Sequence, residues 1–385
     1  MSGSLGRCYS LEDFELAARR KLPRLIHGFI AGGAETEAGL RDNCAAFQDY
    51  TFVSRILADV SGRSQRATLF GRDYAAPFGI APMGAAAICG YRADRALARA
   101  AALAEIPMIV SAAGLTSLET MRREGATTWF QLYVPGTPAR YEPLIDRAGA
   151  AGYDTLVVSA DVPVPANREN NLRNGFSLPV KLSPRVVFDC ARHPGWLLGT
   201  LMRTLMTDGM PHFENMDATR GPPIFSRNQV RDVAGRDALT WGHLSAMRKR
   251  WPGKLIVKGI LSREDARIAR ESGVDGIILS NHGGRQLDGA ISALRVLPEI
   301  VADLPDFPVL LDGGVRRGSD VLKALALGAC FVFIGRPMLF AAALFGEVGV
   351  ARAIVLMKAE IDRDLAMLGL TQIDRLTPEY VRKIR

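Results

Sequence analysis

Apolar residues in this chain fall into short runs that alternate with amphipathic segments. Beyond residue 70, eight of these runs have the length of buried strands, and segments of helical period lie between them. The pattern predicts strands at residues 78–83, 108–111, 128–133, 155–161, 255–258, 276–279, 308–312 and 331–336. It predicts helices at residues 94–104, 117–124, 141–151, 240–251, 263–272, 292–302, 319–327 and 337–368.

This alternation predicts an α/β fold, a (β/α)8 TIM barrel, as one domain spanning residues 1–385. A doubly wound open sheet is the rival, but no G-x-G-x-x-G sequence opens a first βαβ unit. Residues 1–70 have a polar, helical pattern and predict an N-terminal helical cap. In it, a helix starts near Ser10, Gly32 and Gly33 end a helical stretch, and a further helix begins near Glu35.

Composition narrows the class of protein. The formal net charge is +8, but the basic residues are scattered and no nucleic-acid-binding motif accompanies them, so nucleic acid is not an expected partner. Anionic substrates, a phosphate-bearing cofactor or an acidic membrane surface remain open. The five cysteines form no CxxC pair and predict neither disulfides nor a metal site. We see no secretory signal and no apolar run long enough to span a bilayer, and therefore expect a cytoplasmic protein.

Each predicted strand ends in residues that are unusual in an apolar core. Barrel enzymes place their active sites at the carboxyl ends of the strands, so we expect these side chains to converge on one mouth. Any one of them could be a satisfied polar residue, whereas all of them together indicate a site. In chain order they are Met83 with Gly84, Ser111, Gln131 with Tyr133, Ser159 with Asp161, Lys258, His282, Asp312 and Arg336.

The stretch after the sixth strand, residues 280–288, has the sequence SNHGGRQLD. Its two glycines allow a sharp bend that brings His282 and Arg285 to the same mouth. A histidine can take up a proton near neutral pH, and an arginine can hold a carboxylate with two parallel bonds. The pair therefore suits proton abstraction from a small organic acid, although His282 taken alone favours a core histidine followed by a polar turn.

Two glycine–arginine turns follow the last two strands. Residues 312–318 read DGGVRRG and residues 335–337 read GRP. Loops at these positions of a barrel often bind a phosphate through backbone N–H groups, and Arg316 and Arg336 would add positive charge.

A long insertion, residues 163–237, separates the fourth strand from the fifth. Its middle part, within residues 190–215, is apolar with a few arginines. That composition suits a segment on a membrane surface or under a partner subunit, and it equally suits an active-site lid.

With these motifs, the chain resembles the FMN-dependent 2-hydroxy acid dehydrogenase/oxidase family, which includes glycolate oxidase and the flavin-type lactate and mandelate dehydrogenases. The resemblance runs from KLP at residue 21 to GRP at residue 335. It is most specific in SNHGGRQLD and in LDGGVRRGSDVLKALALGA, which begins at residue 311.

The resemblance implies a role for each strand-end residue. His282 would be the catalytic base, and Asp161 would stabilise its protonated form and raise the histidine pKa. Arg285 and Arg168 would hold the substrate carboxylate, with Tyr133 at the substrate hydroxyl. Lys258 would lie near the flavin N1–C2 carbonyl. The other implied contacts to FMN come from Pro82, Met83, Gly84, Ser111, Gln131, Ser159, Ser280, Asp312, Gly313, Gly314, Arg316, Gly335 and Arg336.

The chain departs from the family pattern at several positions. Phe29 stands where a tyrosine usually contacts the substrate carboxylate, and Met83 where threonine is common. Ala113 stands where oxidases often carry a bulky aromatic residue, so a larger substrate side chain would fit. Gly84 is typical of the dehydrogenases, since oxidases often carry alanine there.

We therefore expect an FMN enzyme that oxidises a lactate- or mandelate-like (S)-2-hydroxy acid and passes the electrons to a quinone or another carrier. The resemblance also implies a homotetramer and peripheral contact with the inner face of the cell membrane. A flavin oxidase that uses oxygen remains open, as does a relative whose substrate differs because of Phe29. An inactive flavin-binding or membrane-associated module and a non-flavin barrel lyase are further alternatives.

Overall fold

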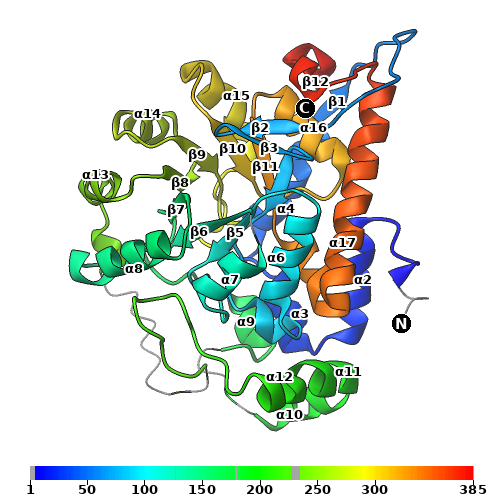
Figure 1. Cartoon of the computed structure of the whole chain (residues 1–385). Helices are drawn as coiled ribbons and strands as arrows, with labels where there is room; N and C mark the ends of the chain where they lie inside the picture. Colours follow the sequence, from blue (N-terminus) through cyan, green and yellow to red (C-terminus); the bar gives the residue numbers. More distant parts are fainter. Residues whose placement is uncertain are drawn as a thin grey trace.

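A closed barrel of eight parallel strands forms the centre of the computed structural model (Figure 1), in the order β10–β11–β4–β5–β6–β7–β8–β9. The structure describes residues 5–125, 127–177, 181, 183–224, 226 and 235–384. The closed sheet confirms the predicted (β/α)8 barrel and excludes the open sheet. The strands are β4 (Phe78–Ile80), β5 (Met108–Ser111), β6 (Thr128–Leu132), β7 (Thr155–Ser159), β8 (Lys254–Ile260), β9 (Gly276–Leu279), β10 (Val309–Asp312) and β11 (Phe331–Ile334).

Helices follow the strands around the barrel, within a few residues of their predicted positions. A separate cluster of buried side chains on alternate strand positions, among them Ile109, Trp129 and Ile278, fills the barrel interior. Because the interior is packed, the polar strand ends are left at its mouth. The helices are α5 (Ala86–Cys89), α6 (Ala93–Leu103), α7 (Leu118–Glu124), α8 (Pro138–Ala150), α13 (Trp241–Arg250), α14 (Arg263–Glu271), α15 (Ala293–Asp303), α16 (Gly318–Ala326) and α17 (Arg336–Met367).

The long C-terminal helix α17 corrects one expectation. Among the described residues, it is the one helix long and apolar enough by length and composition to cross a membrane, although no such run was expected. Half of its most apolar window is buried, and the helix bends at Gly346, which has φ +59°. It packs along α6 and α2 (Leu11–Lys21) at one side of the barrel (Figure 1). Its apolar length therefore serves the core of the domain.

The N-terminal cap begins as predicted and then differs. Ser10 caps α2, α3 (Arg24–Ala31) ends at Gly32, and α4 (Ala38–Ala45) starts three residues after Glu35. After the 3-10 helix η1 (Ala46–Asp49), the rest of the cap, up to residue 70, is not helical as expected but contains short strands. Of these, β1 (Tyr50–Phe52) pairs with β12 (Val381–Lys383), and β2 (Ala67–Leu69) pairs with β3 (Arg72–Tyr74). These three-residue strands are too short to show a period-two pattern, so the sequence pattern missed them.

Within the insertion after β7, the segment from α10 to α12 forms a separate helical layer beside α3 and α9 (Figure 1). Residues 178–180, 182, 225 and 227–234 of the predicted insertion lie outside the described residues. The described helices are α9 (Glu169–Arg173), α10 (Pro184–Ala191), α11 (Pro194–Trp196), the π-helical η2 (Leu197–Met202), α12 (Arg203–Thr207) and the 3-10 turn η3 (Arg236–Ala238).

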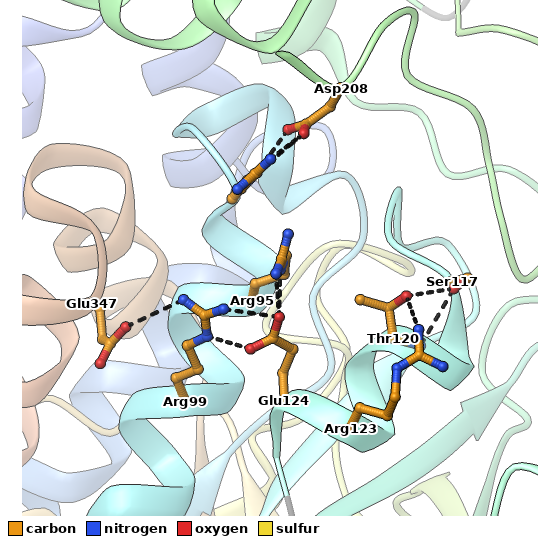
Figure 2. Close-up of polar contacts among 9 residues, drawn as sticks. Arg95, Arg99, Ser117, Thr120, Arg123, Glu124, Asp208 and Glu347 are labelled. Atoms are coloured by element: carbon orange, nitrogen blue, oxygen red, sulfur yellow. Dashed lines mark hydrogen bonds and ion pairs between the residues drawn. The ribbon is translucent and has the colours of Figure 1, made fainter.

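Specific side chains hold this layer on the barrel. Trp196 is buried and donates its indole N–H to the carbonyl of Ile88, 3.0 Å away. At the far end of α12, Arg92 donates through Nε to Asp208 at 2.9 Å. Figure 2 shows the contact between Asp208 and an arginine. It also shows the neighbouring cluster in which Glu124 pairs with Arg95 and Arg99 of α6. The layer is thus tied to α5 through α11 and to the N-cap of α6 at the end of α12.

Candidate active site

The carboxyl ends of the strands open into a cavity of about 650 Å³. Most of the residues singled out from the sequence line it, and they come from seven strand ends, the cap and the insertion. They are Phe29, Pro82, Met83, Gly84, Ala113, Tyr133, Arg168, Lys258, His282, Arg285, Asp312, Gly313, Gly314, Arg316, Gly335 and Arg336. Asp161 contacts His282, and Ser111, Gln131, Ser159 and Ser280 are buried at the same strand ends.

His282 and Asp161 form a hydrogen-bonded pair beside this cavity. Nδ1 of His282 lies 3.1 Å from both carboxylate oxygens of Asp161. Nε2 lies 3.4 Å from the hydroxyl of Tyr133. A carboxylate on Nδ1 favours the tautomer with the proton on that nitrogen, so the lone pair of Nε2 is left on the side of Tyr133. The pair is therefore built to accept a proton at Nε2.

Two opposing effects act on the pKa of His282. Burial lowers the pKa below its ordinary value, and Asp161 opposes this shift without reversing it. Asp161 favours the charged form, as expected, but the net pKa is lowered because burial penalises the imidazolium more strongly. The pKa of Asp161 is also lowered: burial would raise it, but His282 and Lys258 outweigh that effect. A neutral imidazole beside a carboxylate is thus the resting state at neutral pH.

The backbone at His282 and the two residues after it has an unusual conformation. His282, Gly283 and Gly284 all lie in the left-handed region, with φ of +58°, +67° and +70°. A Cβ on Gly283 would lie 2.6 Å from a guanidinium nitrogen of Arg336, and one on Gly284 would overlap the backbone of Leu40. The two glycines are therefore required for the turn, and they leave His282 as a strained non-glycine residue of a kind that clusters at functional sites.

Two arginines of the cavity are held by the cap. Arg285 donates to the carbonyl oxygens of Phe29 at 2.8 Å and Gly32 at 2.9 Å. Arg336 donates to the carbonyl oxygens of Ile30 at 3.1 Å and, again, Gly32 at 3.0 Å. These carbonyls end α3, where the helix dipole favours cations. Sequence reasoning missed this link, because backbone acceptors leave no side-chain signal.

Positive charge at the same mouth exceeds what the protein neutralises locally. Burial lowers the pKa of Arg285 well below its ordinary value, with Arg168 and Arg336 adding repulsion. Burial lowers the pKa of Arg336 to about 10, helped by Arg316. Arg168 donates to the Arg285 carbonyl at 3.1 Å and to Gln286 at 2.8 Å, so the two predicted clamp residues are neighbours. An anionic ligand would relieve this repulsion.

Lys258 belongs to a buried polar group on adjacent strands. Its ammonium donates to Ser280 at 2.7 Å and pairs with Asp312 at 2.9 Å. Burial alone would lower the pKa of Lys258, but Asp312 and Asp161 outweigh burial and raise it. Lys258 is therefore a protonated cation at the floor of the cavity.

Unsatisfied polar atoms at the strand ends test whether FMN fits here. The side-chain atoms Gln131 Nε2, Ser159 Oγ and Asp312 Oδ1 are buried and have no hydrogen-bond partner among the residues that the structure describes. Buried polar atoms are nearly always paired in native proteins, so three orphans at one mouth indicate a polar ligand. A flavin ring and its ribityl chain carry the required acceptors and donors, and these residues therefore fit the group.

The two glycine–arginine turns fit the phosphate of FMN. Gly313 and Gly314 have φ of +104° and +80°, and a Cβ on Gly314 would overlap the backbone of Asn43. Successive backbone N–H groups in such a turn form an anion-binding concavity. Arg316 and Arg336 lie in the same cavity wall, as predicted.

Apolar side chains from the cap and the insertion form the opposite wall. The ring of Phe29 stacks on Phe176, with centroids 4.3 Å apart at 21°, and the guanidinium carbon of Arg285 lies 5.3 Å from the Phe29 centroid. Leu172 and Met216 join this wall. The insertion thus has two parts: residues near its ends line the cavity, as a lid would, and α10–α12 lie outside it.

The insertion residues Phe176, Met216 and Arg236 were not predicted as site residues. They have no motif around them, and only the path of the folded chain brings them to the cavity. An aromatic or basic residue within an insertion is not, by itself, a signal that sequence reasoning could use.

Comparison with known families gives a match over most of the chain. A family described as FMN-dependent dehydrogenase matches residues 18–383. The (S)-mandelate dehydrogenase of Pseudomonas putida is 40% identical over 375 residues, covering 97% of this chain and 94% of the relative. A putative L-lactate dehydrogenase of Mycobacterium tuberculosis is 36% identical over 384 residues, covering 99% and 91%.

Solved structures agree with these relatives. The crystal structure of the monotopic membrane protein (S)-mandelate dehydrogenase superimposes with a TM-score of 0.89 at 39% identity, covering 98% of this chain and 100% of that one. A mandelate oxidase with (S)-2-phenylpropionate gives a TM-score of 0.79 at 33% identity, covering 97% of both chains.

Proposed function

The chain belongs to the FMN-dependent dehydrogenase family, and on that premise we propose that it oxidises an (S)-2-hydroxy acid, mandelate- or lactate-like, to the 2-oxo acid. The observation that carries this proposal is the His282–Asp161 pair, whose Nε2 faces the Tyr133 hydroxyl in a cavity lined by Arg168 and Arg285. A base and a carboxylate clamp at one mouth are what the oxidation of a 2-hydroxy acid requires.

Binding comes first. Arg168 and Arg285 hold the substrate carboxylate. Because these two buried cations repel each other, a bound anion stabilises both. Fixing the carboxylate leaves the CH–OH carbon close to His282 and Tyr133, because C2 is bonded directly to the carboxylate carbon.

The proton is handled by His282. Its Nε2 removes one proton from the CH–OH group, and Asp161 on Nδ1 stabilises the imidazolium that forms. Tyr133 donates a hydrogen bond to the substrate oxygen from the same side as the base. When bound, FMN would supply the acceptor for the hydride equivalent, the second hydrogen with the two electrons, that the substrate loses. Lys258, kept protonated by Asp312, provides fixed positive charge at the floor of the site.

We assign the onward acceptor of the electrons to a quinone or another carrier rather than oxygen. Gly84 supports this assignment, since a Cβ there would lie 2.8 Å from the Cβ of Ala113, so the alanine common in oxidases would force a shift. The structural likeness to a mandelate oxidase keeps the oxygen-using alternative in the test. Faster reoxidation of the enzyme by air than by a soluble quinone would overturn the assignment.

The insertion supports a place on the cytoplasmic face of the membrane. On one side of α11, η2 and α12, Trp196, Thr200 and Thr204 are buried. On the other side, four residues apart, Leu198, Met202 and Met206 are exposed by 64%, 43% and 82%. Exposed Phe188 on α10 and the exposed cations Arg185, Arg192 and Arg203 complete this apolar, cationic surface.

Such a surface suits the boundary of an anionic bilayer, where apolar side chains enter the acyl region and arginines meet phosphates. The likeness to a mandelate dehydrogenase described as a monotopic membrane protein supports the same assignment. We therefore propose that α10–α12 rest on the membrane, with the barrel held above it.

One experiment tests the function directly. The purified protein is examined for an FMN spectrum and mixed anaerobically with glycolate and with both enantiomers of lactate and mandelate. We expect bound FMN that an (S)-2-hydroxy acid bleaches and its (R)-enantiomer does not. A protein that binds no flavin, or a flavin that no 2-hydroxy acid bleaches, would overturn the proposal.

A further inference from the structure

The proposed reaction uses polar groups of the cavity and leaves an apolar part of its wall for the substrate side chain. Arg168 and Arg285 take the carboxylate and His282 faces C2, so the atoms beyond C2 lie against the remaining wall. Ala113, two residues after β5, and Met216, in the insertion, belong to that wall. An apolar side chain is more stable there than beside buried cations, because it returns no hydrogen bond to them.

Met216 lies close to the loop that carries Ala113. The backbone N–H of Glu214 donates to the carbonyl of Gly114 at 3.2 Å, so the insertion runs alongside this loop. The side chain of Met216 packs on a cluster of buried apolar residues that includes Leu115. It is only partly buried, and it also borders the cavity. Met216 therefore stands in the wall near Ala113.

Asn215, the residue before Met216, joins the insertion to the same loop through both ends of its amide. It is fully buried. Its Oδ1 accepts the backbone N–H of Leu118 at 2.8 Å, and its Nδ2 donates to the carbonyl of Thr116 at 2.9 Å. A buried amide that one loop satisfies at both ends fixes the next residue relative to that loop.

Both sides of this amide contact are held by helices around the barrel. On the loop side, the buried carboxylate of Asp94 on α6 accepts the backbone N–H of Leu115 and the hydroxyl of Thr116, both at 3.3 Å. On the insertion side, Arg147 of α8 donates to the carbonyl of Glu214 at 2.9 Å. The position of this part of the insertion is therefore set by the barrel and not by the layer of α10–α12.

We propose that Met216 is a specificity-determining residue that limits the length of the substrate's apolar side chain, and that Asn215 is the residue that positions it. This inference rests on the proposed function and deepens it, since it says which side chains the site accepts. The small side chain of Ala113 leaves room beside C2 for a group larger than methyl. Met216 bounds the wall beyond that group, so a longer chain meets its thioether.

The size of the effect follows from how hydrophobic pockets discriminate by length. One methylene in such a pocket changes kcat/KM by roughly 10- to 200-fold. Methionine is unbranched and adapts its shape, so the limit that Met216 sets lies at the lower end of this range. Truncation of Met216 to alanine should therefore favour a longer substrate by about tenfold.

The test compares two substrates that share the carboxylate and the phenyl group but differ in length. Anaerobic flavin reduction is measured with (S)-2-hydroxy-4-phenylbutanoate and (S)-mandelate, and (S)-lactate is the short reference. The variants are Met216→Ala, Met216→Leu and a matched control, Met367→Ala. Met367 ends α17 and is 69% exposed. Flavin absorbance and Tm show that each variant is folded and loaded.

We expect the ratio of kcat/KM for the phenylbutanoate to that for mandelate to rise about tenfold in Met216→Ala. Met216→Leu conserves most of the volume, so this variant and Met367→Ala should leave the ratio within about twofold. Binding of the two corresponding 2-oxo acids, followed by the flavin difference spectrum, should shift in the same direction. An unchanged or lower ratio in Met216→Ala overturns the role of Met216.

Asn215→Ala tests the positioning role. The variant releases Met216 from the loop, so the ratio should rise by roughly threefold or more. Added to Met216→Ala, it should change the ratio by less than about twofold, because both residues act through one wall. If Asn215 is merely structural, rates fall with all three substrates and the ratio stays unchanged, and that result overturns its role. Should Asn215→Ala not fold, Asn215→Asp keeps the acceptor for Leu118 and gives the same comparison.

Failure of this inference and failure of the proposed function give different results. A flavin that (S)-mandelate or (S)-lactate bleaches, with a substrate ratio that Met216→Ala does not raise, overturns this inference and leaves the proposed function intact. A flavin that none of the three acids bleaches overturns the proposed function instead.

Discussion

The carboxylate of Asp161 reaches Nδ1 of His282 at 3.1 Å, although the two residues follow β7 and β9 and the strand β8 runs between them. Gly259 on β8 makes this contact possible. It has φ +109°, and a Cβ there would lie 2.6 Å from the Cβ of Asp161. The base of the active site thus depends on one glycine of the intervening strand.

Gly259→Ala should therefore damage both stability and activity. The change combines an unfavourable φ with a clash against Asp161, and we expect a loss of about 2 kcal/mol in the free energy of unfolding. Denaturant unfolding and anaerobic flavin reduction measure the two effects. Gly199→Ala is the control, because a Cβ there would meet nothing within 4 Å. Wild-type stability and activity in Gly259→Ala would contradict the role of this glycine.

Asp161→Asn should change both the height and the position of the pH profile. Asp161 favours the charged form of His282, so its loss should lower the pKa of His282 further and move the acid limb of kcat/KM to lower pH. The plateau should fall roughly 100-fold or more, because the imidazolium formed during the reaction loses its counter-ion. Measured pH–rate profiles of both proteins check this, and an acid limb shifted to higher pH would refute the assignment.

In the wild type, the pKa of His282 also predicts where kcat/KM falls on the acid side of the pH profile. His282 must be neutral to accept a proton, and burial lowers its pKa below the ordinary value of about 6.5. Activity should therefore persist below that pH and fall only as the pH drops through the lowered pKa. A limb centred well above pH 7 in kcat/KM would indicate that Asp161 outweighs burial.

Phe29→Tyr should strengthen substrate binding. The ring of Phe29 is held by Phe176 on one side and lies against Arg285, so an added hydroxyl would stand near the carboxylate clamp. One further hydrogen bond contributes about 1 kcal/mol, which predicts a roughly fivefold lower KM for a 2-hydroxy acid. Steady-state kinetics give the answer. An unchanged or higher KM would show that the para position of this ring points away from the substrate.

Membrane association should depend on the α10–α12 surface. The double variant Phe188→Glu/Met206→Glu removes apolar area and adds charge that anionic lipids repel, so flotation with anionic phospholipid vesicles should fall by about tenfold or more. Leu57→Glu is the matched control, since Leu57 is fully exposed but belongs to the cap. Equal flotation of the double variant and the wild type would show that the α10–α12 surface does not bind the membrane.

The fold was predictable because parallel strands buried on both faces read as continuous apolar runs. The bounds of β5 and β9 coincide with the predicted residues 108–111 and 276–279. The strand-end residues were predictable for a related reason, since polar side chains directly after such runs must lie at the mouth of the barrel.

What the sequence did not predict depends on contacts between distant segments. The carbonyls of Phe29 and Gly32 that hold Arg285, and the Gly136–Gly235 contact that places Arg236, join parts of the chain that no local pattern connects. The net lowering of the His282 pKa was not predicted for a similar reason, because it depends on how deeply the folded chain buries the ring.

The central claim is that Nε2 of His282 removes a proton from a bound 2-hydroxy acid. The most direct test is single-turnover flavin reduction under anaerobic conditions, comparing the wild type with His282→Asn, both loaded with FMN. We expect equal flavin content and substrate-analogue binding, with bleaching of the variant slower by roughly a thousandfold or more. Bleaching of His282→Asn within tenfold of the wild-type rate would contradict the account.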